Sequence, residues 1–180
     1  MELFTLDRQY VYKAGGLITD LSRSKPDFGF RSFDAILHLA YRSDLRSVDG
    51  EQNLIATDNL INALDDLKSP PKVFLLASTM AVYGCRNGKL LDEMAVTRPY
   101  SSYGQIKLEI EQRVLAWCRK KNIRCVILRL PMILGKSSKG NLARMIDAIR
   151  DNRYMGIGSG SSRRSMVLAA DIAAFLPQLS

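Results

Sequence analysis

The sequence predicts an α/β protein built around a doubly wound parallel sheet. Two segments, 72–78 (KVFLLAS) and 124–130 (RCVILRL), are nearly continuous apolar runs, as expected of strands whose two faces are both covered. Segments with apolar residues at helical spacing alternate with these runs, and this alternation favours parallel pairing. Hydrophobic residues make up 47% of the 180 residues and charged residues 24%, which excludes collagen-like, disulfide-scaffold and fully disordered chains.

The individual elements follow from local patterns. Short apolar or alternating runs, bounded by turn-forming residues, predict strands at 3–6, 33–40, 72–78, 124–130 and 165–169. Helical spacing predicts helices at 52–67, 141–150 and 171–179. Ser101 or Ser102 is suited to cap a further helix that runs to about Lys121, while the Pro70–Pro71 pair ends the helix 52–67.

Basic charge is concentrated in one part of the chain. The whole sequence has 26 Lys and Arg against 18 Asp and Glu, and residues 98–164 hold 15 basic and 4 acidic residues. This excess indicates an anionic partner, either a phosphorylated small molecule or a nucleic acid, or else a solvated basic face. No nucleic-acid-binding motif is present, so we expect no nucleic acid partner.

Cysteine and histidine usage excludes a zinc site and favours a reducing, cytoplasmic compartment. The chain has three cysteines at spacings that match no metal site, and a single histidine. The apolar runs are too short to span a bilayer, and the N-terminus has no secretory signal pattern, so no membrane association is expected.

The motif with the clearest chemistry is Tyr103 and Lys107, four residues apart on one face of a predicted helix. An ammonium beside a phenol favours the phenolate, so the tyrosine becomes usable as an acid or base. Thr79 ends the strand 72–78, at the sheet edge where α/β proteins collect their functional side chains. The three side chains would suit proton transfer at a sugar or alcohol hydroxyl while a nicotinamide exchanges hydride. The same spacing also occurs on solvated helix faces.

Seven segments, in order and at appropriate spacing, resemble motifs of the extended short-chain dehydrogenase/reductases, the NAD-dependent epimerase/dehydratase family. They are 6–8, 34–40, 53–59, 78–84, 99–107, 129–135 and 163–171. The resemblance covers essentially the whole chain and implies a partial NAD(P)-binding Rossmann-like domain over 1–180. Within it, 136–180 would contribute the start of the substrate-binding region.

The resemblance implies NAD as the cofactor, with NADP less favoured. Asp7 would repel a 2′-phosphate, although the neighbouring Arg8 weakens this preference. Leu17 replaces the aspartate that usually meets the adenine amino group. The implied cofactor contacts are Asp7, Arg8, Leu17, Ile18, Leu39, Ala40, Asn53, Ala77, Tyr103, Lys107 and Leu130.

The resemblance also assigns catalytic and substrate roles. Thr79 would hydrogen-bond the reacting sugar oxygen, Tyr103 would be the catalytic acid/base, and Lys107 would lower the pKa of Tyr103 and bind the nicotinamide ribose. The expected partner is a nucleotide-diphosphate sugar, and a homodimer is compatible with the family. Further substrate contacts are implied for Asn141, Leu142 and Arg164. His38 is expected to have a structural role in its strand, and no metal site is expected.

Two departures from the family pattern bear on which reaction is expected. Met80-Ala81 replaces the acidic pair of the 4,6-dehydratases, which disfavours water elimination. Met132 stands where many 4-epimerases have an asparagine. We therefore expect an NAD-dependent nucleotide-sugar 4-epimerase, or a fragment of one, in polysaccharide biosynthesis. An NAD(P)H-dependent keto-sugar reductase, and an inactive truncated relic or polyanion-binding protein, remain the alternatives.

The sequence contains no counterpart of the family's first strand and GxxGxxG turn, nor most of its C-terminal substrate-binding region. In the usual strand order 3-2-1-4-5-6, that first strand is central. We therefore expect the strands 3–6 and 33–40 to lack a strand between them.

Overall fold

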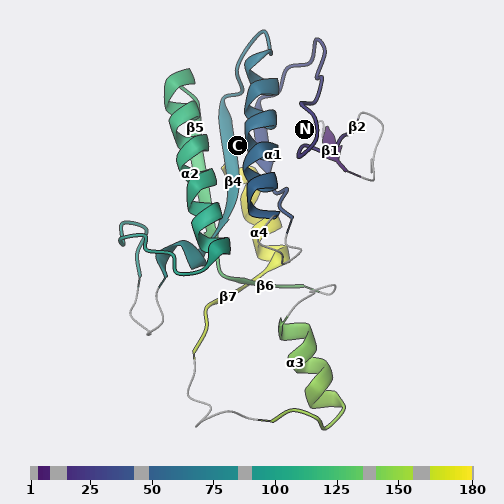
Figure 1. Ribbon diagram of the computed structural model, residues 1–180, viewed down its shortest axis with the longest axis vertical. Helices are drawn as coiled ribbons and strands as arrows, with labels where there is room; N and C mark the ends of the chain where they lie inside the picture. Colours follow the sequence, from purple (N-terminus) through teal and green to yellow (C-terminus); the bar gives the residue numbers. More distant parts are fainter. Residues whose placement is uncertain are drawn as a thin grey trace. The chain divides into compact units, whose positions relative to one another are not determined.

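The computed structural model describes residues 4–8, 16–42, 49–84, 91–135, 141–155 and 163–179 (Figure 1). The chain divides into two compact units. The first unit comprises Met1–Arg86 and Leu91–Arg129, and the second comprises Asn87–Leu90 and Leu130–Ser180.

The described strands of the first unit form two sheets. β1 (Thr5–Asp7) and β2 (Gly16–Ile18) pair in parallel. β3 (Ala35–His38), β4 (Val73–Thr79) and β5 (Arg124–Leu130) form the second sheet in that order, with β3 and β4 parallel. The α/β class and the parallel pairing predicted from the sequence are therefore confirmed.

The two sheets are separate among the described residues, because β1 pairs with β2 and β3 pairs with β4. The sequence predicted this break, since the position between β1 and β3 is where the family order has its central strand. One edge of β1 and one edge of β3 thus have no strand partner in the described part of the chain.

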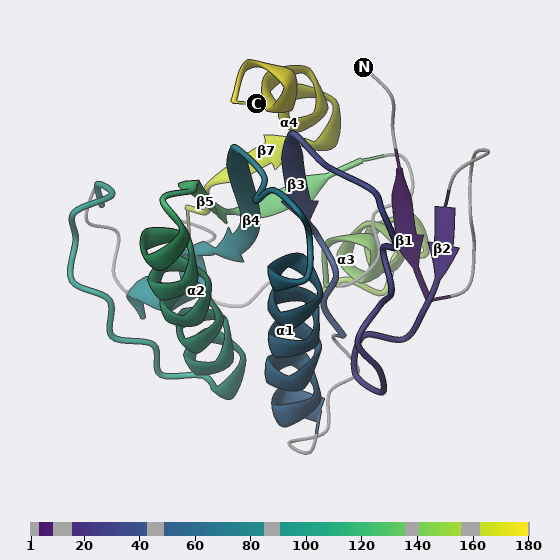
Figure 2. The ribbon, with the colours of Figure 1, turned by 90° about the horizontal axis from the view of Figure 1, so that it is seen from above.

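Two long helices cover one face of the β3–β4–β5 sheet. α1 (Asp49–Asp65) and α2 (Ser102–Lys121) lie side by side, as Figures 1 and 2 show from two directions. Their C-terminal ends are joined at Asp65, which accepts a hydrogen bond of 2.9 Å from Trp117 Nε1 and one of 2.8 Å from Lys121 Nζ. This pairing fixes α2, the helix that carries Tyr103 and Lys107, against the sheet.

The core of the first unit lies between these helices and the sheet. It is centred on Phe74 of β4, which is fully buried and meets Trp117 edge to face at 5.8 Å between ring centroids. Phe4, Phe28 and Phe33 pack around one another and join the N-terminal segment to the same core. The other fully buried members are Leu64, Leu76, Val114 and Cys118.

The second unit contains a parallel pair of short strands, β6 (Met132–Leu134) and β7 (Met166–Leu168), with the helices α3 (Asn141–Arg150) and α4 (Ala169–Phe175). The predicted helix 171–179 is shorter than expected, because a 3-10 turn, Leu176–Gln178, with Pro177 at its start, follows α4. None of the described residues of this unit is buried.

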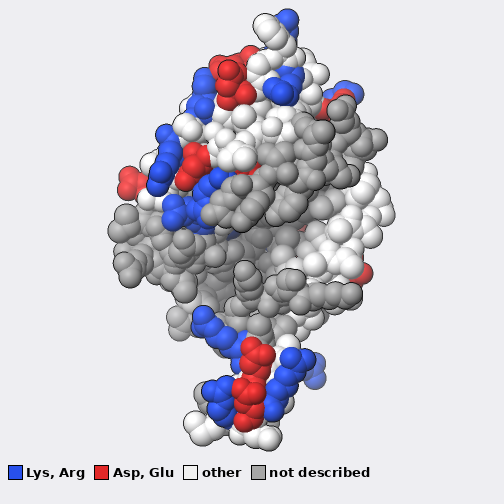
Figure 3. All heavy atoms as spheres, turned by 90° about the vertical axis from the view of Figure 1, so that its right-hand side faces the viewer, with Lys and Arg blue, Asp and Glu red and all other residues white. Residues whose placement is uncertain are grey.

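Two further features of the described residues are the length of the helices and the distribution of surface charge. No helix in the described ranges is long and apolar enough to cross a membrane. On the face shown in Figure 3, basic and acidic side chains are interspersed among the described residues. In α3 and the turn after it, for example, Arg144 and Arg150 are accompanied by Asp147 and Asp151. The described part of this face therefore offers no uniformly basic surface for a polyanion.

Candidate functional site

The candidate site lies where β4 ends. Thr79, the last residue of β4, caps the 3-10 turn η1 (Met80–Tyr83), because its Oγ1 accepts a hydrogen bond of 3.2 Å from the Ala81 amide. Gly84 then turns the chain with a φ of +62°. A Cβ at this position would lie 1.8 Å from the Arg98 carbonyl oxygen, so glycine is required here.

The first turn of α2 packs directly on this end of β4. Ser101 caps the helix by accepting a hydrogen bond of 3.1 Å from the Gly104 amide. A Cβ on Gly104 would lie 2.8 Å from the Ala81 carbonyl oxygen. The glycine after Tyr103 therefore permits the close approach that brings this tyrosine to Thr79.

Thr79 influences the pKa of Tyr103, and the catalytic roles that the sequence suggests for this hydroxyl–phenol pair stay a prediction. The Tyr103 side chain remains open to solvent, with 43% of the residue exposed. Burial of the phenol raises the pKa of Tyr103, and the Thr79 hydroxyl opposes this shift.

Lys107 is buried behind Tyr103 on the same face of α2. Its ammonium donates a hydrogen bond of 3.0 Å to the Ala77 carbonyl oxygen, and only 6% of the residue is exposed. Burial lowers the pKa of Lys107 to about 8, while the charge of Glu111 opposes this shift. Burial is the largest cause of the Tyr103 shift and raises that pKa, and the expectation that Lys107 acts in the opposite direction stays a prediction.

Sequence reasoning missed one aromatic residue of the site, Tyr41. Its ring lies 4.2 Å from Lys107 Nζ, measured to the ring centroid, and 5.3 Å from the Tyr103 ring at an interplanar angle of 86°. Burial and the neighbouring Tyr103 raise the pKa of Tyr41 to about 12. The available signal was its position, three residues after the end of β3, at the same sheet edge as Thr79.

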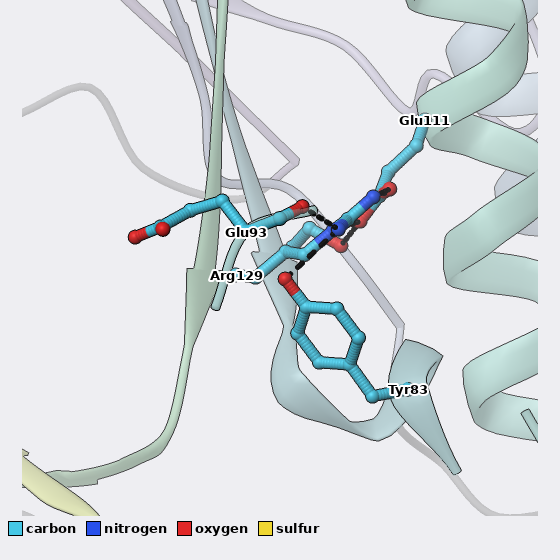
Figure 4. A network of polar contacts seen from close by, with 5 residues as sticks. Tyr83, Glu93, Glu111 and Arg129 are labelled. Atoms are coloured by element: carbon cyan, nitrogen blue, oxygen red, sulfur yellow. Dashed lines mark hydrogen bonds and ion pairs between the residues drawn. The ribbon is translucent and has the colours of Figure 1, made fainter. Parts of the chain in front are cut away.

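A second group missed from the sequence is the buried polar network beneath the site (Figure 4). Glu111 of α2 is only 3% exposed and binds Arg129 of β5, with 2.8 Å between Oε2 and Nη2. The Ser78 hydroxyl donates a hydrogen bond to Glu111, and Arg129 Nη1 donates one of 2.9 Å to the Tyr83 hydroxyl. Because Ser78 lies between Ala77 and Thr79, this network anchors the strand end that contacts both Lys107 and Tyr103.

Several predicted cofactor contacts lie at the ends of strands. Asp7 ends β1 and Arg8 follows it, Leu17 and Ile18 are in β2, and Leu39 and Ala40 follow β3. Ala77 is in β4, where its carbonyl binds Lys107, and Leu130 ends β5. Parallel pairing places the ends of β1 and β2 together, and likewise those of β3 and β4.

Asn53 is buried in α1, where its side chain forms hydrogen bonds with the backbone of Arg42. Its Oδ1 accepts a hydrogen bond of 2.8 Å from the Arg42 amide, and its Nδ2 donates one of 3.1 Å to the Arg42 carbonyl oxygen. Asn53 therefore fixes the segment that carries Tyr41, a role the sequence did not indicate.

The predicted substrate contacts Asn141, Leu142 and Arg164 belong to the second unit. Asn141 and Leu142 begin α3, and their side chains lie outside the described residues. Arg164 is exposed, two residues before β7.

The described ranges contain no group of three His, Cys, Asp or Glu side chains that could hold a metal ion.

The chain is similar to a known protein family and to curated proteins. The model of the NAD dependent epimerase/dehydratase family matches residues 14–178. The chain is 28% identical over 156 residues to an N-acetyl-alpha-D-glucosaminyl-diphospho-ditrans,octacis-undecaprenol 4-epimerase of Escherichia coli O157:H7, an alignment that covers 83% of this chain and 46% of that relative.

Solved structures of 4-epimerases are also similar to this chain. A UDP-glucuronic acid 4-epimerase from Bacillus cereus, in complex with UDP-glucuronic acid and NAD, is 26% identical with a TM-score of 0.66, covering 86% of this chain and 50% of that chain. A UDP-galactose 4-epimerase aligns with a TM-score of 0.78 at 19% identity, covering 98% and 63%. The chain thus spans about half the length of the curated relatives it matches.

Proposed function

The chain belongs to the NAD dependent epimerase/dehydratase family, and from this membership we propose that the protein is an NAD-dependent nucleotide-sugar 4-epimerase. The observation that carries the proposal is the grouping of Thr79, Tyr103 and Lys107 at the end of β4. Relatives and solved structures named as 4-epimerases support the choice of reaction, and two of them are named for UDP-glucuronic acid, a sugar nucleotide. The substrate class follows as a nucleotide-diphosphate sugar.

The residues of the site fit one end of the cofactor. A buried ammonium beside a phenol, on the edge where β3 and β4 end, offers the donors that a nicotinamide ribose requires. The Asp7 carboxylate at the end of β1 offers an acceptor for the adenosine ribose. When bound, NAD would take a hydride from a sugar carbon and return it.

Tyr103 performs the proton transfer in this proposal. Its phenolate receives the proton from the sugar hydroxyl as the keto sugar forms, and the resulting phenol gives the proton back when the hydroxyl forms again with the opposite configuration. Thr79 orients the phenol and contributes its own hydroxyl to the reacting oxygen. The Lys107 ammonium adds positive charge next to the site, which favours the phenolate.

The experiment is a comparison of Tyr103→Phe with Tyr100→Phe. Tyr100 lies close in sequence but outside the site, and it is 61% exposed. The protein is incubated with NAD and, separately, with UDP-glucose, UDP-N-acetylglucosamine and UDP-glucuronic acid, and the 4-epimer is measured by chromatography. We expect turnover by the unsubstituted protein, a loss of about 10²–10⁴-fold in Tyr103→Phe, and no change in Tyr100→Phe.

Two results would contradict this proposal. One is unchanged turnover in Tyr103→Phe, which would remove the phenol from the mechanism. The other is a lack of 4-epimer with all three sugar nucleotides in the presence of NAD.

A further inference from the structure

Tyr41 is the one aromatic side chain that contacts both Lys107 and Tyr103 in the described part of the chain. The Lys107 ammonium lies 4.2 Å from the centroid of the Tyr41 ring. This distance is well within the range of a cation–π contact. The same ring meets Tyr103 at 5.3 Å between centroids and 86° between planes, an edge-to-face arrangement.

The ammonium of Lys107 has few other partners that could hold it. It donates a hydrogen bond of 3.0 Å to the Ala77 carbonyl oxygen. Besides Tyr41, the titratable groups that interact with it are Glu111 on α2 and His38 on β3. Glu111 is already bound by Arg129 and by the Ser78 hydroxyl. The Tyr41 ring and the Ala77 carbonyl are therefore the groups that fix the position of the ammonium.

The Tyr41 ring is itself held by buried contacts. The next residue, Arg42, has both of its backbone polar groups bound by the buried Asn53 side chain, at 2.8 and 3.1 Å. The Arg42 guanidinium donates a further hydrogen bond of 2.8 Å to Gln52 Oε1. Helix α1 thus anchors the segment, and the ring is held at a fixed place in the site.

We propose that Tyr41 is a positioning residue of the site, which holds the Lys107 ammonium against the Ala77 carbonyl with its ring face and packs edge-to-face against Tyr103. This inference rests on the proposed function, because it concerns the lysine and tyrosine assigned there. It adds an aromatic residue that stabilises the charged form of Lys107 despite the burial of that side chain. No catalytic proton transfer is assigned to Tyr41.

The test compares Tyr41→Leu with Tyr41→Phe by NMR titration of the Lys107 side chain, assigned with the help of Lys107→Arg. Leucine keeps apolar cover over the ammonium but removes the aromatic ring, whereas phenylalanine keeps the ring and removes the hydroxyl. We expect Tyr41→Leu to lower the pKa of Lys107 by roughly 0.4 to 1.5 pH units. Tyr41→Phe should leave it unchanged, as should Tyr154→Leu, which removes a half-exposed tyrosine of the second unit.

A second measurement uses the unsubstituted protein and does not depend on whether a variant folds. Protons that lie over an aromatic ring face are shielded by the ring current, so the Lys107 ε-methylene signal should lie upfield of those of exposed lysines. An unshifted signal would overturn the proposal, as would an unchanged or raised pKa of Lys107 in Tyr41→Leu. These titrations require neither NAD nor a nucleotide sugar, so their outcome is separate from that of the Tyr103→Phe assay.

Discussion

At the scale of single residues, Lys107 is flanked by two buried titratable groups that reach it from different elements. His38 comes from β3 and is 6% exposed, and Glu111 comes from α2 and is 3% exposed. The pKa of His38 is lowered by its burial and by the charge of Lys107, so its imidazole is neutral at pH 7. Glu111 is a carboxylate that forms an ion pair with Arg129. Each arrangement leads to a prediction about stability.

Burial of His38 should make the stability of the protein depend on pH below neutrality. Burial and the charge of Lys107 lower the pKa of His38 from 6.5 to about 4. As the pH falls through 6.5, the unfolded chain therefore binds a proton that the folded protein does not. The contribution of His38 to the free energy of unfolding should be constant above this pH and should decrease, by roughly 3 kcal/mol in total, between about pH 6.5 and pH 4.

Urea denaturation at pH 7, 6 and 5, repeated for His38→Gln, measures this effect. His38 is the only histidine in the chain, so the variant should lose the decrease between pH 6.5 and 5. Asp20 and Asp65, whose pKa values are lowered from 3.8, act only in a more acidic range. An equal decrease in the variant would show that His38 is not its source.

Glu111→Gln should destabilise the protein far more than Glu109→Gln, although both glutamates pair with arginine. Glu111 is buried, and its removal as a charge leaves Arg129 without a counter-ion, at a cost of roughly 3 kcal/mol. Glu109 pairs with Arg113 at 3.0 Å, and the two side chains are 45% and 34% exposed, so its loss should cost about 0–1 kcal/mol. Urea unfolding at pH 7 compares them, and similar costs would contradict the assignment of Glu111 as a buried anchor.

At the scale of elements, the N-terminus of α2 connects helix stability to the site. The sequence left two cap candidates, and the structure selects Ser101, whose Oγ accepts the hydrogen bond from the Gly104 amide. Ser101→Ala should therefore lower the free energy of unfolding by about 1 kcal/mol. Ser102→Ala, one position later and exposed, should have almost no effect. A larger effect for Ser102→Ala in thermal or urea unfolding would show that the cap is wrongly assigned.

Long, strongly patterned elements were predictable from the sequence, whereas of the three-residue strands only β1 and β7 were predicted. The apolar run 124–130 coincides with β5, and the predicted helix from Ser101 or Ser102 to Lys121 coincides with α2. The three-residue strands β2 and β6 were missed as strands. So short a strand has too few residues to show a period, and its pairing with a distant partner defines it.

At the scale of the whole molecule, a sheet that is complete in the usual strand order is divided here into β1–β2 and β3–β4–β5. The break was predictable, because the motif order aligned the chain with family strands on either side of an absent central one. The division at Leu130 into two compact units has no counterpart in a motif, because it depends on which segments contact one another. The described side chains of the second unit remain partly or fully exposed, and the first unit contains the buried core.

The sequence by itself determined the fold class and the family, and it singled out Thr79, Tyr103 and Lys107 as candidate site residues, because these depend on local periodicity and on motif spacing along the chain. The tertiary structure decided what surrounds them. Tyr41 reaches Lys107 from the end of a different strand, and Arg129 reaches Glu111 from β5, so no local pattern shows either contact. It also decided the direction of the Tyr103 pKa shift, because desolvation depends on how closely the whole chain packs around the phenol.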